Sequence, residues 1–175
     1  REGFVVPVAG WRRAAHKCAD KVYARLTGEA GYFDSRIVYV SETGPRTNRV
    51  KRLAIMDQDG ANHRFLTSGQ NIVLSPRFAP NSQTISYMSY EASRPRVWLY
   101  NIGSGRQEQV GSFPSMTFAP SFAPDGSRLL LSVMASGNSD IHAVDLSSRQ
   151  SKRLTNTSAI DTSPSTSPDG RRIVF

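Results

Sequence analysis

The sequence predicts a mainly β protein, a partial β-propeller with 44-residue blades that follows the last strand and helix of an α/β domain. One proline motif occurs three times, and its prolines Pro80, Pro124 and Pro168 stand 44 residues apart. This period is typical of four-stranded propeller blades, which bury their faces only by stacking on their neighbours. A second marker with the same spacing, and a helical pattern confined to the first 35 residues, support this fold class.

The first 35 residues are interpreted as the C-terminal end of an N-terminal α/β domain. Residues 4–8 predict a strand and residues 11–27 a helix, which Gly28 ends because glycine adopts the left-handed conformation without a steric penalty. The helix carries one apolar stripe at steps of three or four, formed by Trp11, Ala15, Cys18, Val22 and Leu26. A segment this short rarely folds alone, so it is expected to pack on residues upstream of Arg1.

Residues 36–175 are interpreted as blades 1–3 and half of blade 4. Each unit reads as four short strands, which in blade 3 are residues 120–123, 128–134, 140–146 and 152–156. Apolar runs end at equivalent positions in successive blades, namely Asp57, Asn101 and Asp145. We expect blade 1 to lack its innermost strand and the chain to be a fragment of a longer protein.

The strand after each proline motif is apolar at alternate positions. Because strand side chains alternate between two faces, six of these residues are expected to face a core between blades: Ile85, Tyr87, Leu129, Leu131, Ile173 and Phe175. Leu130 and Val174 are apolar as well, as expected for blades packed on both faces.

Two Asp-Gly pairs at equivalent positions predict hairpin turns. Gly126 and Gly170 supply the positive φ that such turns require, so Asp125 and Asp169 are interpreted as turn residues instead of catalytic carboxylates. In the first copy Asn81 takes the place of the aspartate, and asparagine tolerates the left-handed region better than most residues.

The composition is that of an ordinary globular protein, with 38% hydrophobic and 21% charged residues and no apolar run long enough to span a membrane. The net charge is +8, and its densest cluster is Arg46, Arg49, Lys51 and Arg52. This cluster lacks the interleaved aromatic residues of a nucleic-acid platform, so a solvated surface is favoured and no nucleic-acid partner is predicted. Steering of an acidic protein partner by these charges stays open.

Neither a catalytic residue nor a metal or cofactor site is predicted. The sequence has no Gly-x-Ser-x-Gly nucleophile motif, and His16, His63 and His142 lack metal-ligand spacing. His142 takes a position held by Ala54 and Trp98 in sister blades, which favours packing. The single cysteine, Cys18, lies on the helix stripe, so a buried packing role is favoured over a reactive thiol.

Residues 13–28, which end in Leu26-Thr27-Gly28, and residues 31–40 together resemble the inter-domain junction of the TolB family. The repeats resemble the blades of that family, including Ser112-Phe113-Pro114 before the second proline motif. The resemblance covers essentially the whole chain in the correct order. It implies a six-bladed propeller in a non-enzymatic periplasmic protein of the Tol-Pal system, exported by a signal peptide.

The resemblance also implies partners. The propeller is expected to bind the peptidoglycan-associated lipoprotein Pal, and the N-terminal domain is expected to communicate with TolA, in support of outer-membrane integrity and constriction during cell division. The segments just before the proline motifs are expected to line the propeller mouth. Six residues there are the candidates for contacting Pal: Ser115, Met116, Thr117, Ile160, Asp161 and Thr162.

Two other interpretations stay open at this point. The first is the propeller of a serine peptidase of the prolyl oligopeptidase type, which requires a nucleophile motif followed by Asp and His beyond Phe175. The second is a cytosolic WD-repeat-like scaffold, although the chain contains no Trp-Asp pair. A signal peptide upstream of Arg1, if found, would exclude the second.

Overall fold

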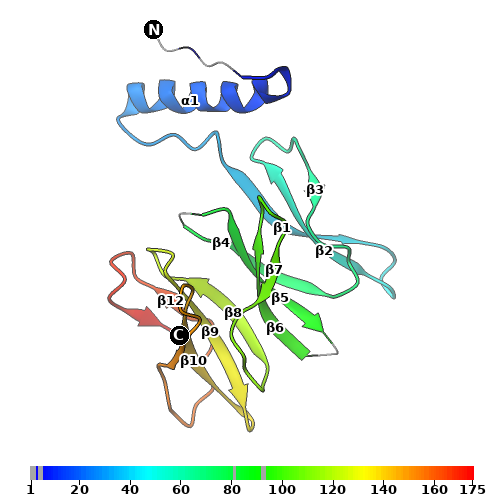
Figure 1. Ribbon diagram of the computed structural model, residues 1–175, viewed down its shortest axis with the longest axis vertical. Helices are drawn as coiled ribbons and strands as arrows, with labels where there is room; N and C mark the ends of the chain where they lie inside the picture. Colours follow the sequence, from blue (N-terminus) through cyan, green and yellow to red (C-terminus); the bar gives the residue numbers. More distant parts are fainter. Residues whose placement is uncertain (1–2, 4–5, 81, 92–93) are drawn as a thin grey trace. The chain divides into compact units, whose positions relative to one another are not determined.

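The structure is a computed structural model that describes residues 3, 6–80, 82–91 and 94–175. Within these residues a helical segment is followed by thirteen short strands in four sheets (Figure 1). The chain forms two compact units, one of residues 1–37 with 55–64 and one of residues 38–54 with 65–175. The domain boundary after residue 35 stays a prediction.

The helical segment consists of η1 (Val8–Gly10) and α1 (Trp11–Thr27), so α1 has the predicted bounds. Gly28 ends the helix in the left-handed conformation, with φ 77° and its N–H donated to the carbonyl of Ala24 at 2.9 Å. The helix and its terminating glycine are therefore confirmed.

The strand expected at residues 4–8 is not confirmed. Phe4 and Val5 lie outside the described residues, while Val6 and Pro7 belong to no strand and Val8 begins η1. The prediction is wrong for these last three residues. Proline cannot donate an N–H to a β-ladder, so Pro7 disfavours a strand unless it lies at an edge.

Polar side chains attach α1 to the rest of its unit. The carboxylate of Asp20 accepts the backbone N–H of Phe33 at 2.6 Å. Arg12 and His16 both approach Asp59, at 2.5 Å and 3.2 Å. Hydrogen bonds to Ala61 N–H and Arg12 lower the pKa of this carboxyl group. The helix thus packs through the side on which its charged residues lie.

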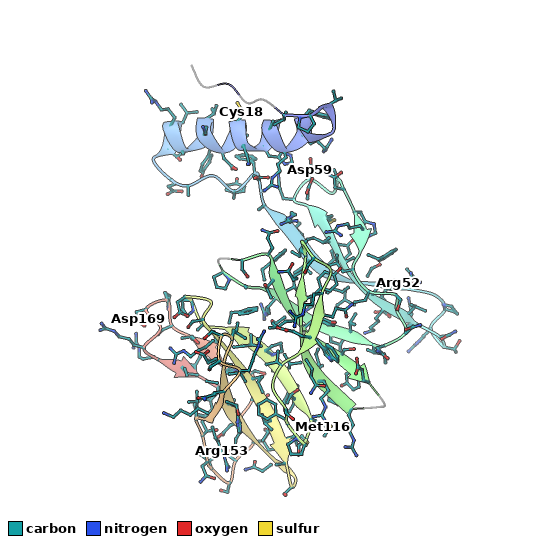
Figure 2. The ribbon with its side chains drawn as sticks, viewed as in Figure 1. Cys18, Arg52, Asp59, Met116, Arg153 and Asp169 are labelled. Carbon is teal, nitrogen blue, oxygen red and sulfur yellow. The ribbon has the colours of Figure 1, made fainter. Side chains whose placement is uncertain are left out.

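The apolar stripe of α1 faces away from these contacts. All five of its members are exposed: Trp11, Ala15, Cys18, Val22 and Leu26. Figure 2 shows Cys18 and Asp59 on opposite sides of the helix. The buried role favoured for Cys18 is therefore wrong in this structure, because no described element covers the stripe.

Blades 2 and 3 each have four strands in sequential order, and blade 1 has three. The strands of blade 1 are β1 (Arg36–Thr43), β2 (Val50–Asp57) and β3 (Arg64–Phe65). Those of blade 2 are β4 (Val73–Phe78), β5 (Thr84–Glu91), β6 (Arg94–Asn101) and β7 (Gln107–Gln109). Those of blade 3 are β8 (Thr117–Phe122), β9 (Arg128–Ala135), β10 (Asn138–Asp145) and β11 (Ser151–Arg153).

Two further strands, β12 (Ser165–Thr166) and β13 (Ile173–Val174), form the start of blade 4. The four sheets thus have three, four, four and two strands along the chain, while the assignment of residues 36–175 to blades 1–3 and half of blade 4 stays a prediction. The three apolar runs end as predicted, because β2, β6 and β10 stop at Asp57, Asn101 and Asp145.

The core between blades 2 and 3 is apolar. It contains seven buried residues from the two sheets and the adjoining loop: Val97, Leu99, Val110, Leu129, Leu131, Val133 and Val144. Ile85 and Tyr87 are also buried, and Leu130 is buried on the other face of blade 3, as predicted. Ile173 is half-buried and Phe175 is exposed. The predicted alternation therefore holds in the four-stranded blades.

The two Asp-Gly pairs form the predicted turns. Gly126 and Gly170 have φ 70° and 71°, and each donates its N–H to the residue three positions earlier. Asp125 accepts hydrogen bonds from the hydroxyl and the N–H of Ser127, which lower the pKa of its carboxyl group. Asn81 lies outside the described residues.

Candidate partner-binding site

Three loops connect the last strand of one blade to the first strand of the next, and we call them the mouth loops. They are residues 66–72, 110–116 and 154–164. Ser115 and Met116 lie in the second loop, next to β8 (Figure 2). Ile160, Asp161 and Thr162 lie in the third loop.

Thr117 and Asp161 were expected on the surface of the mouth loops, but both are buried. Thr117 is the first residue of β8, not a loop residue, and is 1% exposed. Asp161 is 6% exposed, and both its carboxylate oxygens lie 3.2 Å from the hydroxyl of Thr157. The two positions are equivalent in the 44-residue repeat, so burial here is a property of the blade. Their side chains support the loops from inside.

The residues just before them are exposed and apolar. Ile160 is 68% exposed and Met116 is partly exposed. The equivalent residue in the first mouth loop is Ile72, which is 49% exposed and was not among the predicted site residues. The repeat itself identifies it, since Ile72, Met116 and Ile160 stand 44 residues apart. Successive mouth loops therefore present an apolar side chain at the same position.

The second mouth loop is fixed at its end by backbone and side-chain hydrogen bonds. The carbonyl of Met116 accepts the N–H of Met134 at 3.0 Å, and Ile72 accepts the N–H of Tyr90 in the same way at 2.9 Å. The hydroxyl of Thr117 accepts the buried N–H of Val97 at 2.9 Å. This last bond joins blade 3 to blade 2.

The third mouth loop is fixed by hydrogen bonds to blade 3. The hydroxyl of Ser139 donates to the carbonyl of Asp161 at 2.9 Å. The backbone carbonyl of Ser139 accepts the N–H of Asp161, also at 2.9 Å. Asn138 donates its amide to the carbonyl of Thr157 at 2.7 Å. Ile160 is thus carried by a loop with fixed ends.

A cavity of about 380 Å³ adjoins Met116. Pro114, Met116, Met134 and Ala135 give it an apolar wall, and Arg94 adds a cation to its lining. Methionine side chains adapt to differently shaped partners, so this cavity suits an apolar side chain of a protein partner.

A strained residue recurs at 44-residue spacing in β4, in β8 and near the end of the third mouth loop. Ser75, Ala119 and Ser163 have φ 51°, 50° and 56°, although none is glycine, and each precedes a proline. In β4 and β8 the pairing register shifts at this point, which marks a β-bulge. Such a conformation costs about 1–3 kcal/mol per residue and is found mainly at functional positions. The three residues line a second cavity, of about 420 Å³, with Arg77 as its charged residue.

His142 lies behind the second mouth loop. Its ring makes an edge-on contact with Phe113, with the ring centroids 5.5 Å apart, which agrees with the predicted packing role. Burial and the nearby Arg153 lower the pKa of His142, and Asp140 opposes this effect. The structure thus places against the loop a histidine whose charged form is disfavoured.

The basic cluster is partly neutralised. Arg49 and Lys51 lie 3.4 Å and 3.7 Å from the carboxylate of Glu42, and Arg52 stacks on the ring of Phe65. These contacts support the prediction of a solvated surface. Among the described residues, no group of His, Cys, Asp and Glu is arranged to hold a metal ion. Nor does the described part contain a helix long and apolar enough to cross a membrane.

Comparison with known proteins agrees with the repeat architecture. The family described as the TolB beta propeller domain matches residues 23–175. The Tol-Pal system protein TolB of Rhizorhabdus wittichii is 80% identical over 94 residues, which are 54% of this chain and 21% of the relative. The protein of the same name from Zymomonas mobilis is 71% identical over 104 residues, 59% of this chain and 23% of the relative.

The crystal structure of TolB from Acinetobacter baumannii aligns with a TM-score of 0.84 and 38% identity, and covers 98% of this chain and 43% of that one. The chain thus spans less than half the length of the relatives that it matches. Both the blade sequences and their arrangement agree with these proteins. The chain belongs to the TolB family of β-propeller proteins.

Proposed function

We propose that this chain is part of a non-enzymatic, periplasmic adaptor of the Tol-Pal system whose propeller binds the lipoprotein Pal through the mouth loops. The observation that carries the proposal is a set of apolar residues at one repeat position, on loops with fixed ends: Ile72 and Ile160 are exposed and Met116 is partly exposed. Exposed apolar residues flanked by polar ones are typical of protein interaction sites.

Of the six residues predicted from the sequence, four supply the proposed contact surface: Ser115, Met116, Ile160 and Thr162. Thr117 and Asp161 act from inside, as the residues that hold the backbone of the loops. The expected partner therefore places apolar side chains against the mouth loops, with one of them in the cavity beside Met116.

Calorimetric titration of the full-length protein with the soluble domain of Pal from the same cell tests this function. Saturable one-to-one binding is expected. Met116→Asp is expected to weaken binding by about 1–3 kcal/mol, because the carboxylate loses water in the contact. Gln150→Asp, which introduces the same carboxylate at an exposed position between β10 and β11, away from the mouth loops, serves as the control and is expected to bind normally.

Absence of binding, with both proteins folded, contradicts the adaptor function. Binding that Met116→Asp leaves unchanged retains Pal as the partner but removes Met116 from the contact surface.

The wider role follows from the same family. We propose that the protein communicates with TolA through its N-terminal domain and supports outer-membrane integrity and constriction during cell division. In a strain that lacks the protein, the wild-type gene is expected to stop leakage of periplasmic enzymes, and the Met116→Asp gene to do so less well. Equal complementation would contradict a role for the mouth loops in this process.

A further inference from the structure

We infer that Arg96 is a positioning residue, which holds the second mouth loop in its binding conformation through three backbone carbonyl groups. The inference rests on the proposed function for its effect on binding, and on the described contacts for its effect on the loop.

Arg96 lies on β6 and is half-buried. Its guanidinium donates hydrogen bonds to the carbonyls of Phe113 at 2.9 Å and Ser115, and approaches that of Pro114 at 3.5 Å. One planar group with several fixed donors thus contacts three consecutive residues. Only a guanidinium has this geometry, since a lysine ammonium is a point charge on a flexible stem.

These contacts lie directly beside the proposed surface, because Met116 follows Ser115. The other described contacts of residues 112–115 include the packing of the Phe113 ring on His142 and on the core between blades 2 and 3. Pro114 has no N–H to donate, and the next described backbone bond along the chain is from Met134 to the carbonyl of Met116. Ordering a free loop costs conformational entropy at each residue, so a loop that is fixed before binding spares this cost at association.

Among the described residues of the sister blades, the one equivalent to Arg96 does not contact three loop carbonyls. Arg52 takes the equivalent position in blade 1 and donates to a single loop carbonyl, that of Ser68, at 3.1 Å. In blade 3 the position is Asp140, which pairs with Arg153 at 2.6 Å, and Arg153 donates to the carbonyl of Thr155 at 2.8 Å. Among the three described loops, the one that carries Met116 is therefore the one in which a single side chain contacts three consecutive carbonyls.

Two substitutions separate positioning from charge. Arg96→Met removes both the charge and the donors, while Arg96→Lys keeps the charge and loses the planar fork. Arg149→Met is the matched control, because Arg149 also joins blade 3 to blade 2, through Glu108, but lies in the turn after β10, at the opposite ends of the strands. All three are compared with the wild type in the full-length protein.

The first readout is amide hydrogen exchange of Met134, whose N–H is donated to the carbonyl of Met116, in the free protein, and it needs no partner. Exchange is expected to rise several-fold in Arg96→Lys and Arg96→Met and to stay unchanged in Arg149→Met. The second readout is the Kd for the soluble domain of Pal at two salt concentrations. Both Arg96 variants are expected to bind about tenfold more weakly, the effect of losing charge-assisted hydrogen bonds, with the same ratio to wild type at both concentrations.

Unchanged exchange in both Arg96 variants would overturn the inference. So would full recovery of affinity in Arg96→Lys, or a loss that disappears at high salt, because either result assigns the effect to charge. If wild type itself fails to bind Pal, the proposed function fails, and the exchange measurement still decides whether Arg96 holds the loop.

Discussion

Single hydroxyl groups satisfy buried backbone donors at one position of each blade. The N–H groups of Leu53 and Ile141 are donated to the hydroxyls of Thr67 and Thr155, at 2.9 Å and 3.0 Å. The equivalent residue in blade 2 is Gly111, which has no hydroxyl. Thr117 of the next blade accepts the bond from Val97 in its place. Thr117, which was predicted to contact the partner, therefore has the structural role that Thr67 and Thr155 have in the other two blades.

Thr117→Val is expected to lower the free energy of unfolding by about 1–3 kcal/mol, because it leaves the buried N–H of Val97 without an acceptor. Urea denaturation measures this change. Thr117→Ser keeps the hydroxyl and is expected to lose much less. A larger loss in Thr117→Ser than in Thr117→Val would show that the methyl group, and not the hydrogen bond, carries the effect.

The stability of the fold is expected to fall as the pH is lowered through the titration range of His142. The folded pKa is below the ordinary value of 6.5, so at intermediate pH the unfolded chain binds more protons than the folded one. The contribution of His142 to the stability of the fold is complete above pH 6.5 and is lost as the pH falls from 6.5 to the lower pKa of the folded state.

Urea titrations across this range, with His142→Phe as comparison, test the effect. Sister blades already hold Ala54 and Trp98 at this position, so an uncharged residue is tolerated. The variant is expected to depend less on pH than the wild type between pH 7 and 5. An identical dependence would contradict the assignment to His142.

At the scale of elements, the turns of the proline motifs were predictable because their chemistry is local. An Asp-Gly pair fixes the turn whatever surrounds it, as does Gly28 after α1. The left-handed conformation of Ser75, Ala119 and Ser163 could not be predicted in this way. At Ser75 and Ala119 it accompanies the shift in register of β4 and β8 against their neighbours, which is a property of the sheet.

Gly126→Val is expected to cost about 1–3 kcal/mol of unfolding free energy, because a β-branched residue is strained at φ 70°. A Cβ at this position meets only Pro80, at 3.8 Å, so crowding is not the cause. Gly103→Val is the control, since Gly103 does not have a positive φ. If both variants melt at the wild-type temperature, the strain assigned to Gly126 is absent.

At the scale of the molecule, the repeat spacing predicted most of the architecture. A period of 44 residues places the strands and turns of successive blades at equivalent positions. It does the same for the apolar residues Ile72, Met116 and Ile160 of the mouth loops. The spacing cannot show which side of α1 is covered, because its apolar stripe and its polar side are both plausible packing surfaces. The contacts of Arg12, His16 and Asp20 use the polar side.

The mouth loops were predictable in position but not in exposure. The sequence does not distinguish Met116 from Thr117, or Ile160 from Asp161, because burial depends on where the inner strand begins. The structure places the apolar member of each pair outside and the polar member inside. The contact surface is therefore more apolar than the six predicted residues imply.

The central claim is that partner binding occurs at the mouth loops. The most direct measurement places a photoreactive amino acid at Ile72, Met116 or Ile160 of the full-length protein and irradiates each variant with the soluble domain of Pal. The same amino acid at Asp169, in the turn of a proline motif, is the control. The account predicts crosslinks to Pal from all three mouth positions and none from Asp169. Crosslinks from Asp169 alone would place the partner at the other ends of the strands and contradict the account.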